Sequence, residues 1–410
     1  MLRILPSVFV LLSTACAMEW PEFRGPLANG LVEATNTPVK IDLEKDLVWE
    51  TEIPGKGWSS PVMSDGLIVV TAAEGQEKIE LRVVAVDAKS GKIVWDQLVF
   101  EPTAEEAGVI HAKNSLASST ALIANGVVYA HFGHMGTAAL SLKEGKIAWK
   151  FHETYASMHG NGGSPILVGD VLIFSADGED EGLLRGLDAK TGKKTWEVNR
   201  GKDVRQKFSF GTPVVIPDDE GPLIVCQGSG MVGAYRPAKG ELVWSVDYGS
   251  GFSVVPRPVL DEGVVYLTTG FGLPKLLAIS LEGAKGDVTK THVKWSAKRD
   301  IPKTPSFVVS GDSIFLVEDT GRLSCLDKQT GERLWMEPLM RNISSSLTMV
   351  GDLLYSFTEE GQGLVHRVSR EGATLLAENS YGEPIFASPM IMDGALIVRS
   401  EKRLRKIGKK

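Results

Sequence analysis

The sequence predicts an all-β protein folded as an eight-bladed β-propeller of four-stranded antiparallel blades. Three observations carry this prediction: a repeated motif that ends in Trp, a second repeat of paired apolar runs, and no long segment of helical period in 410 residues. Two classes of protein are disfavoured at once. Three Cys are too few for a disulfide scaffold, and a net charge of -7 offers no general attraction to nucleic acid.

The first repeat combines Asp with Gly four positions later and Trp eight positions later. It is clearest at residues 86–95, 187–196 and 326–335. Looser copies extend the series, and its Trp residues follow one another at intervals of 46, 54, 47, 48, 51 and 40. We expect these rings to pack between neighbouring blades as a structural tryptophan-docking set: Trp49, Trp95, Trp149, Trp196, Trp244, Trp295 and Trp335. Trp20 and Trp58 lie outside the repeat.

The second repeat is a small residue, often followed by Pro, and then two apolar runs separated by Asp or Gly. Runs of four to six residues rich in Val and Ile and bounded by turn residues are typical of a β-hairpin. Eight copies begin at Ser60, Thr120, Ser164, Thr212, Arg257, Pro305, Ser345 and Ser388. Each unit of about 46 residues therefore supplies four strands, which is the size of one propeller blade.

The two ends of the repeat array complement each other. The last copy, residues 388–407, has three strands and lacks a Trp strand, whereas residues 47–51 form a Trp strand with no blade before it. Pairing these segments would complete the eighth blade and remove an exposed sheet edge. We therefore expect a ring closed by one N-terminal strand and three C-terminal strands.

Residues 1–17 have the pattern of a signal peptide, with Arg3 before an apolar run and Ala15-Cys16-Ala17 as the cleavage site. We expect residues 18–46 to form a lead-in segment and residues 47–410 to form the propeller. No later apolar run approaches the length of a transmembrane helix. The chain is expected to be exported, to the periplasm or outside the cell. A lipid anchor at Cys16 would attach it to the outer membrane, although Ser13 stands where a lipoprotein signal usually has Leu.

The Asp-x-x-Thr-Gly-x-x-x-Trp pattern of the blades resembles the tryptophan-docking repeat of the PQQ-like, quinoprotein-type β-propellers. The resemblance covers nearly the whole mature chain. It is greatest to the secreted, single-domain branch related to the outer-membrane assembly lipoprotein BamB, and the lead-in at residues 20–26 also resembles the start of many secreted members. The quinoprotein alcohol dehydrogenases of this superfamily carry adjacent cysteines beside their cofactor, and this chain has no Cys-Cys pair.

The resemblance implies an exported, non-catalytic binding or scaffold protein of the cell envelope that holds a protein or an envelope polymer. No nucleic-acid partner and no cofactor are expected, and the chain is expected to be a monomer. The alternative is an enzyme with its site at the mouth of the central channel, either a quinoprotein-type oxidoreductase that uses PQQ with Ca²⁺ or a sugar-active enzyme. No catalytic residue is assigned, because no nucleophile–base motif is present.

A candidate ligand site lies in the loops of blades two to five. Loops that lead into the innermost strands of a propeller gather at one mouth of the central channel, where a rigid scaffold positions them. Cationic groups beside Asn amides there suit an anionic or polyhydroxylated ligand. The candidate residues are His111, Lys113, Asn114, His134, His159, Asn161, Lys207 and Arg257. No metal site is expected, because the His residues lack compact ligand spacing.

Overall fold

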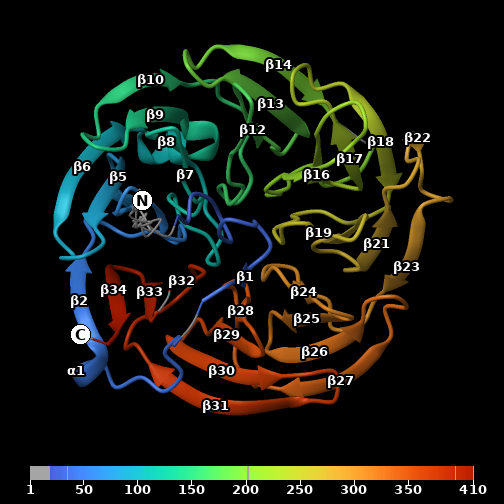
Figure 1. Cartoon of the computed structure of the whole chain (residues 1–410). Helices are drawn as coiled ribbons and strands as arrows, with labels where there is room; N and C mark the ends of the chain where they lie inside the picture. The colour runs from blue at the N-terminus through green and yellow to red at the C-terminus, as the bar shows by residue number, and fades with distance from the viewer. Residues whose placement is uncertain (1–18, 35, 201–202, 393, 410) are drawn as a thin grey trace, which may run out of the picture.

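The computed structural model describes residues 19–34, 36–200, 203–392 and 394–409. Figure 1 shows eight sheets arranged as blades around a central axis, which confirms the eight-bladed propeller. Each blade has four antiparallel strands, and blades four and seven each add one short parallel strand. The expected signal peptide and Cys16 lie outside the described residues. Among the residues described, no helix is long and apolar enough to cross a membrane.

The first four blades follow the chain from Val62 to Asp247. Blade one contains β3 (Val62–Ser64), β4 (Leu67–Glu74), β5 (Glu80–Asp87) and β6 (Ile93–Phe100). Blade two contains β7 (Leu122–Ala124), β8 (Val127–His131), β9 (Thr137–Ser141) and β10 (Ile147–Phe151). Blade three contains β11 (Ile166–Val168), β12 (Val171–Ser175), β13 (Leu183–Asp188) and β14 (Lys194–Asn199). Blade four contains β15 (Val214–Ile216), β16 (Leu223–Gly228), β17 (Met231–Tyr235) and β18 (Leu242–Asp247), extended by the parallel strand β22 (Gly286–Asp287).

The remaining blades complete the ring. Blade five contains β19 (Val259–Asp261), β20 (Val264–Thr268), β21 (Leu276–Ser280) and β23 (Val293–Ala297). Blade six contains β24 (Val308–Ser310), β25 (Ser313–Glu318), β26 (Arg322–Asp327) and β27 (Arg333–Pro338). Blade seven contains β28 (Thr348–Val350), β29 (Leu353–Phe357), β30 (Gln362–Val368) and β31 (Ala373–Ser380), with β1 (Leu31–Val32) parallel to β28. Blade eight contains β32 (Met390–Met392), β33 (Ala395–Arg399), β34 (Arg403–Gly408) and β2 (Leu47–Glu52).

Blade eight closes the ring as the sequence predicts. The N-terminal strand β2 pairs antiparallel with the C-terminal strand β34, with Trp49 opposite Lys406 and Thr51 opposite Leu404. The side chain of Thr51 also donates a hydrogen bond to the backbone oxygen of Gly91 in blade one. Because both ends of the ring meet within one sheet, the outermost strand of blade eight is supplied from the other end of the chain.

The tight hairpins follow from residues that tolerate positive φ. Asp65 and Gly66 join β3 to β4 with φ values of 50° and 76°, which is the conformation of a type I′ turn. Asn125 and Gly126 repeat this conformation in blade two, at 51° and 74°. Such turns match the right-handed twist of the flanking strands, so these short sequences set the register of each inner hairpin.

The Trp repeat joins each blade to the next. In blade one, Asp87 Oδ1 accepts hydrogen bonds from the backbone N and the hydroxyl of Ser90 at 2.7 and 2.6 Å. Gly91 follows at φ 73°, and a Cβ there would lie 2.7 Å from the ring of Trp49. The indole of Trp49 donates to the backbone oxygen of Ala88 at 3.2 Å. Corresponding bonds on the next blade are made by Trp95, Trp149, Trp196, Trp295 and Trp335.

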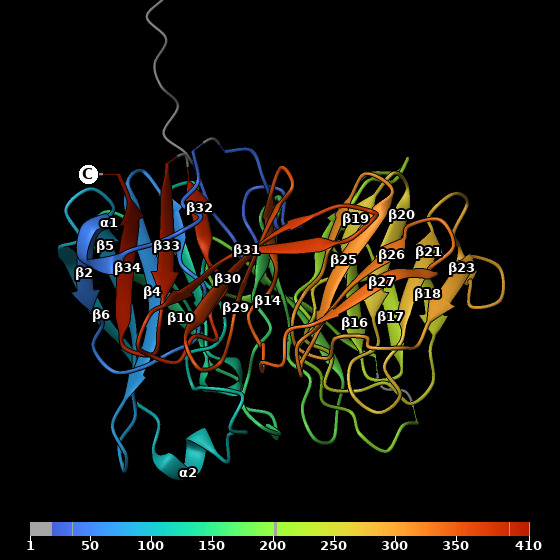
Figure 2. The ribbon, with the colours of Figure 1, turned by 90° about the horizontal axis from the view of Figure 1, so that it is seen from below.

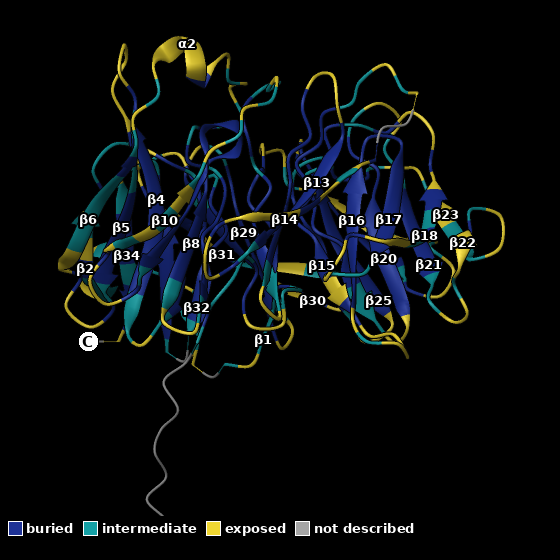
Figure 3. Cartoon of the chain, turned by 90° about the horizontal axis from the view of Figure 1, so that it is seen from above, coloured by how far each residue is buried: buried dark blue, intermediate teal, exposed yellow. Residues whose placement is uncertain are grey.

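The two ends of the channel differ. Helix α2 (Ala104–Ala107), the 3₁₀ helix η1 (Gly133–Met135) and the loops that lead into the innermost strands gather on one side, named here the α2 face (Figures 2 and 3). The short helix α1 (Leu43–Asp46) directly precedes β2. Residues 19–30 cross the opposite end, where Trp20 forms a bridge with Met63 and Ile123 N donates to Pro21 O. This lead-in segment therefore covers the channel opposite the α2 face.

Candidate functional site

A ring of hydroxyl groups surrounds the channel at the start of the innermost strands. The backbone N of Ser60 donates to Thr120 Oγ1, and the same bond links each blade to the hydroxyl of the next at 2.9–3.1 Å, except between blades four and five, where Arg257 supplies no hydroxyl. It ends with Ser388 N donating to Ser60 Oγ. We name this set the hydroxyl ring: Ser60, Thr120, Ser164, Thr212, Ser306, Ser346 and Ser388, with Arg257 at the position of blade five.

A cavity of about 260 Å³ lies on the α2 side of the hydroxyl ring. Small-molecule sites commonly occupy about 300–1,000 Å³, so this cavity is slightly smaller than that range. Its hydroxyl-bearing lining residues are Ser60, Ser118, Thr120, Ser164, Ser253, Thr304, Ser344, Ser346 and Ser388. Its aromatic lining residues are Phe23, Trp58, Phe208, Phe210, Phe252, Phe271 and Phe386. His111, Lys113, Asn114 and His159 line its blade-two and blade-three side.

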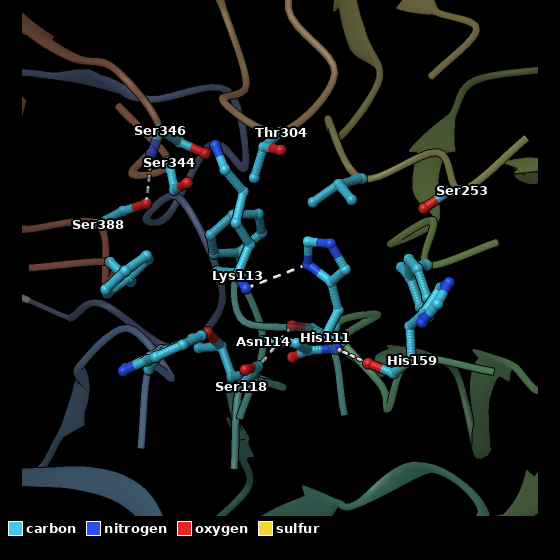
Figure 4. A pocket seen from close by; sticks show the side chains of 18 of the residues that line it. His111, Lys113, Asn114, Ser118, His159, Ser253, Thr304, Ser344, Ser346 and Ser388 are labelled. Carbon is cyan, nitrogen blue, oxygen red and sulfur yellow. Dashed lines mark hydrogen bonds between the residues drawn. The ribbon is translucent and has the colours of Figure 1, made fainter. Parts of the chain in front are cut away.

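The loop before β7 folds against the loop before β11. Asn114 Nδ2 donates to the backbone oxygen of His159 at 2.9 Å (Figure 4). Ile110 forms a parallel bridge with His159. His159 has a φ of 67°, which is strained for a residue with a side chain. The rings of His111 and His159 meet edge to face at 5.4 Å. Burial lowers the pKa of His159, and the nearby charge of His111 lowers it further, so its imidazole is neutral at pH 7.

Lys113 connects this loop to the opposite side of the mouth. Its Nζ lies 2.9 Å from Glu359 Oε1 of blade seven and 3.9 Å from Asp319 Oδ1 of blade six. The backbone N of Lys113 donates to His111 Nδ1 at 3.1 Å, which leaves the proton of a neutral imidazole on Nε2. Glu359 also accepts from the hydroxyl of Ser344 at 2.6 Å. The ammonium charge of Lys113 is therefore neutralised at the rim of the cavity.

Aromatic rings form two walls. Trp58 stacks on Phe386 with ring centroids 4.0 Å apart and an interplanar angle of 17°. On the other side, Phe208 contacts Phe252 edge to face at 5.6 Å, and Phe252 lies 6.4 Å from Phe271. These rings give the cavity a flat apolar surface above the hydroxyl ring.

The structure brings four of the eight sequence candidates to this cavity: His111, Lys113, Asn114 and His159. The other four are not among its lining residues. Asn161 is buried and donates to Gly163 O. Lys207 precedes Phe208 in the chain, and Phe208 lines the cavity in its place. Four of the eight candidates therefore line the cavity and four do not.

The polar atoms of His134 and Arg257 bind other parts of the fold. His134 lies in η1, and its Nε2 is 2.9 Å from Glu106 O. Arg257 is buried and binds Pro213 O, Phe23 O and Glu22 Oε2, which ties the lead-in segment to blade five. Sequence spacing located both residues in the right loops, but it could not show that their polar atoms have protein partners.

Sequence reasoning missed most of the cavity wall. The expected site drew on blades two to five, whereas Trp58 and Ser60 come from blade one, Ser346 from blade seven and Phe386 from the loop before blade eight. The position of Trp58 outside the Trp repeat was the available signal.

The lining does not suit a quinone held by Ca²⁺. Calcium takes six to eight oxygen ligands, with carboxylates prominent among them. None of the lining residues in the described part of the chain is Asp or Glu. The two Cys that the structure describes, Cys226 and Cys325, are buried and unpaired in different blades. No group of three or more potential metal ligands occurs within the described ranges.

These features define a class: eight-bladed propellers with Trp-docked blades and a cavity at one end of the central channel. The family model described as "Outer membrane protein assembly factor BamB" matches residues 31–178 and 155–337. The chain therefore belongs to this family.

Curated relatives agree with that assignment, and solved structures share the fold. Outer membrane protein assembly factor BamB of Yersinia pestis is 25% identical over 337 residues, covering 78% of this chain and 77% of the relative. The Salmonella typhimurium protein is also 25% identical, with 86% of each chain covered. The crystal structure of BamB from Moraxella catarrhalis superposes with a TM-score of 0.64 at 14% identity, covering 89% of this chain and 97% of that one. A europium-containing methanol dehydrogenase reaches 0.69 at 13% identity, covering 94% and 90%, and shares the fold.

Proposed function

We propose that this chain is an exported envelope protein that binds a protein partner on its α2 face and catalyses no reaction. The observation that carries the proposal is a set of exposed apolar side chains on that face. Val109, Leu273 and Met340 are 85%, 73% and 78% exposed. They stand in the loop after α2, the β20–β21 loop and the loop after β27, which belong to different blades.

An exposed apolar side chain of this kind gains free energy when a partner covers it. The three positions surround the mouth of a rigid ring, so a partner can contact them together without a change in the fold. The family relatives are named outer membrane protein assembly factors. By analogy we assign the partner to the outer-membrane assembly machinery and the site of action to the periplasmic side of that membrane.

The chemistry of the cavity supports binding over catalysis. Lys113 is ion-paired with Glu359, and His111 Nδ1 is occupied by a backbone N–H. General acid–base catalysis needs a group free to take or give a proton beside the reacting atom. The cavity instead presents hydroxyl donors and aromatic surface.

Photo-crosslinking in the native envelope tests the proposal. A photoreactive residue is placed at position 273, at 340, or at Leu27, which is 62% exposed in the lead-in segment on the other side of the ring. We expect positions 273 and 340 to capture the same outer-membrane assembly protein, identified by mass spectrometry, and position 27 not to capture it. Equal capture from position 27 would contradict the assignment to the α2 face.

A double variant measures the apolar contribution. Leu273→Asp with Met340→Asp should reduce co-purification of the captured protein by about tenfold or more, because each change costs a buried apolar contact of roughly 1–2 kcal/mol. Leu27→Asp is the matched control and should bind like the wild type. Unchanged binding by the double variant would refute the proposed surface.

A further inference from the structure

The hydroxyl ring presents an excess of hydrogen-bond donors to the cavity. Each hydroxyl has one O–H donor and two lone pairs. In the ring, one lone pair accepts a backbone N–H from the neighbouring blade. In the part of the chain that the structure describes, none of the ring hydroxyls donates its own hydrogen to a protein acceptor. Five of them line the cavity: Ser60, Thr120, Ser164, Ser346 and Ser388.

Three buried arginines stand next to this ring. Arg24, Arg257 and Arg399 are 3%, 1% and 1% exposed. Arg24 Nη2 donates to Phe307 O at 2.6 Å, one residue after the ring member Ser306. Arg399 Nη1 donates to Ser59 O at 3.1 Å, one residue before Ser60. Arg257 occupies the ring position of blade five.

These positive charges are incompletely balanced. Arg257 pairs with Glu22 at 2.7 Å, whereas Arg24 and Arg399 form no ion pair among the described residues. Arg24 Nε and Nη1 and Arg399 Nε are buried without a hydrogen-bond partner there. Burial, aided at Arg24 by the neighbouring Arg257, lowers the pKa of both groups to about 9. None of the three arginines lines the cavity, and they stand behind the ring that does. An uncompensated buried charge is costly, and an anion held at the ring would offset part of that cost.

The aromatic part of the lining determines which apolar group a ligand can carry. The Trp58–Phe386 stack and the Phe208–Phe252 pair face the cavity with apolar ring surface. Flat aromatic walls favour a planar apolar group, which can stack against them. The same lining contains no carboxylate. Glu359, which contacts the lining residues Lys113 and Ser344 at the rim, is paired with the ammonium of Lys113.

We propose that the cavity binds a small organic anion whose carboxylate accepts hydrogen bonds from the hydroxyl ring and whose planar body lies between the aromatic walls. The binding requires no metal ion, because the donors and the positive charges belong to this chain.

Calorimetric titration of the full chain with 2-naphthoate tests the ligand class. We expect 2-naphthoate to bind about tenfold or more tightly than neutral 2-naphthylmethanol, because hydrogen bonds to a charged acceptor are the stronger kind. Sodium sulfate should not displace it at equal concentration. Equal affinity for the alcohol would overturn the anion assignment, and displacement by sulfate would overturn the role of the aromatic walls.

Two matched variants locate the site. Thr120→Val and Thr212→Val each remove one ring hydroxyl that accepts a backbone N–H at 2.9 Å, and both residues are buried. Only Thr120 lines the cavity. Thr120→Val should weaken 2-naphthoate binding by about tenfold, and Thr212→Val should leave it within about twofold. Equal effects of the two variants would refute the site. If Thr120→Val fails to fold, the wild-type comparison of acid and alcohol still decides.

Ligand binding in the cavity does not depend on the proposed partner. The ring lies inside the channel, whereas Leu273 and Met340 are exposed on the α2 face. A Leu273→Asp and Met340→Asp variant that loses its partner but still binds 2-naphthoate would separate the two activities. Failure of naphthoate binding with intact partner capture would overturn the cavity proposal alone.

Discussion

At the scale of single residues, burial changes the chemistry of groups that look reactive in the sequence. His131 ends β8 with its side chain in the interior, where its ring lies 4.2 Å from that of Phe174. Its Nδ1 is 2.8 Å from Thr137 Oγ1, and its Nε2 is buried without a partner among the described residues. Burial, followed by the positive charge of Arg185, lowers the pKa of His131 to about 3. This imidazole is therefore a neutral part of the core.

The depressed pKa of His131 predicts a loss of stability in acid. The unfolded imidazole takes up a proton as the pH falls below about 6.5, whereas the folded one stays neutral until about pH 3, so protonation favours the unfolded state in that window. The free energy of unfolding should fall between pH 7 and about pH 4.5, and this fall should be about 2 kcal/mol smaller in His131→Phe than in the wild type. Urea unfolding at both pH values measures this. His152→Phe, at an exposed position, is the control, and an identical pH dependence in His131→Phe would contradict the prediction.

At the scale of elements, the blade repeat is a docking device between neighbouring sheets. Asp87, Asp188 and Asp327 each cap a turn through hydrogen bonds from the backbone and hydroxyl of a Ser or Thr three residues later. The Gly that follows has positive φ and lies directly under the Trp of the preceding blade. Blade four departs from this pattern: Trp244 is buried, and its strand β18 is extended by β22, where Trp244 pairs with Gly286.

Two glycines separate backbone strain from Trp packing. Gly192 and Gly169 both have positive φ, at 72° and 59°. A Cβ on Gly192 would lie 2.5 Å from the ring of Trp149, whereas a Cβ on Gly169 would have no neighbour within 4 Å. Gly169→Ala should cost about 1–2 kcal/mol from backbone conformation alone. Gly192→Ala should cost roughly 1–3 kcal/mol more, because the ring of Trp149 must move. Chemical denaturation measures both, and equal costs would refute the packing role.

At the scale of the whole molecule, the ring is held by contacts between segments that are distant in sequence. Strand β2 completes the sheet of β34, and the lead-in segment spans the channel from Trp20 at blade one to Arg24 at blades six and seven. The hydroxyl ring adds a bond on the inside between successive blades, except between blades four and five. Trp49 links the closing blade to blade one, so its packing contributes to closure.

Closure predicts unequal costs for equivalent Trp residues. Trp49 is 8% exposed, whereas Trp335 is half-buried, although both dock on the next blade. Trp49→Ala should therefore destabilise the fold by about 3–5 kcal/mol. Trp335→Ala should cost about 1–2 kcal/mol, since less apolar area is lost. Global unfolding of the two variants, monitored by circular dichroism, measures both costs. A cost at Trp335 equal to that at Trp49 would show that closure adds nothing to the docking contact.

Part of the candidate site could be located from the sequence, but most of the cavity wall could not. The loops before β7 and β11 were identified by their polar residues, and His111, Lys113, Asn114 and His159 do line the cavity. In the loop before β15, the sequence indicated Lys207 as a candidate, whereas Phe208 and Phe210 form the wall. A polar residue in a loop is visible in a sequence, but the direction of its side chain depends on the packing around it.

The sequence by itself determined the fold class, the number of blades and the closure by β2, because these follow from local patterns: turn residues at fixed positions, apolar alternation and a Trp at a constant distance from Gly. Only the tertiary structure decided which residues share the cavity. Phe23, Trp58, Lys113 and Phe386 are far apart in the chain and meet only when the ring is closed. Whether Arg24, Arg257 or Arg399 has a charged partner depends on the same closure, since burial and long-range contacts set the balance of charge.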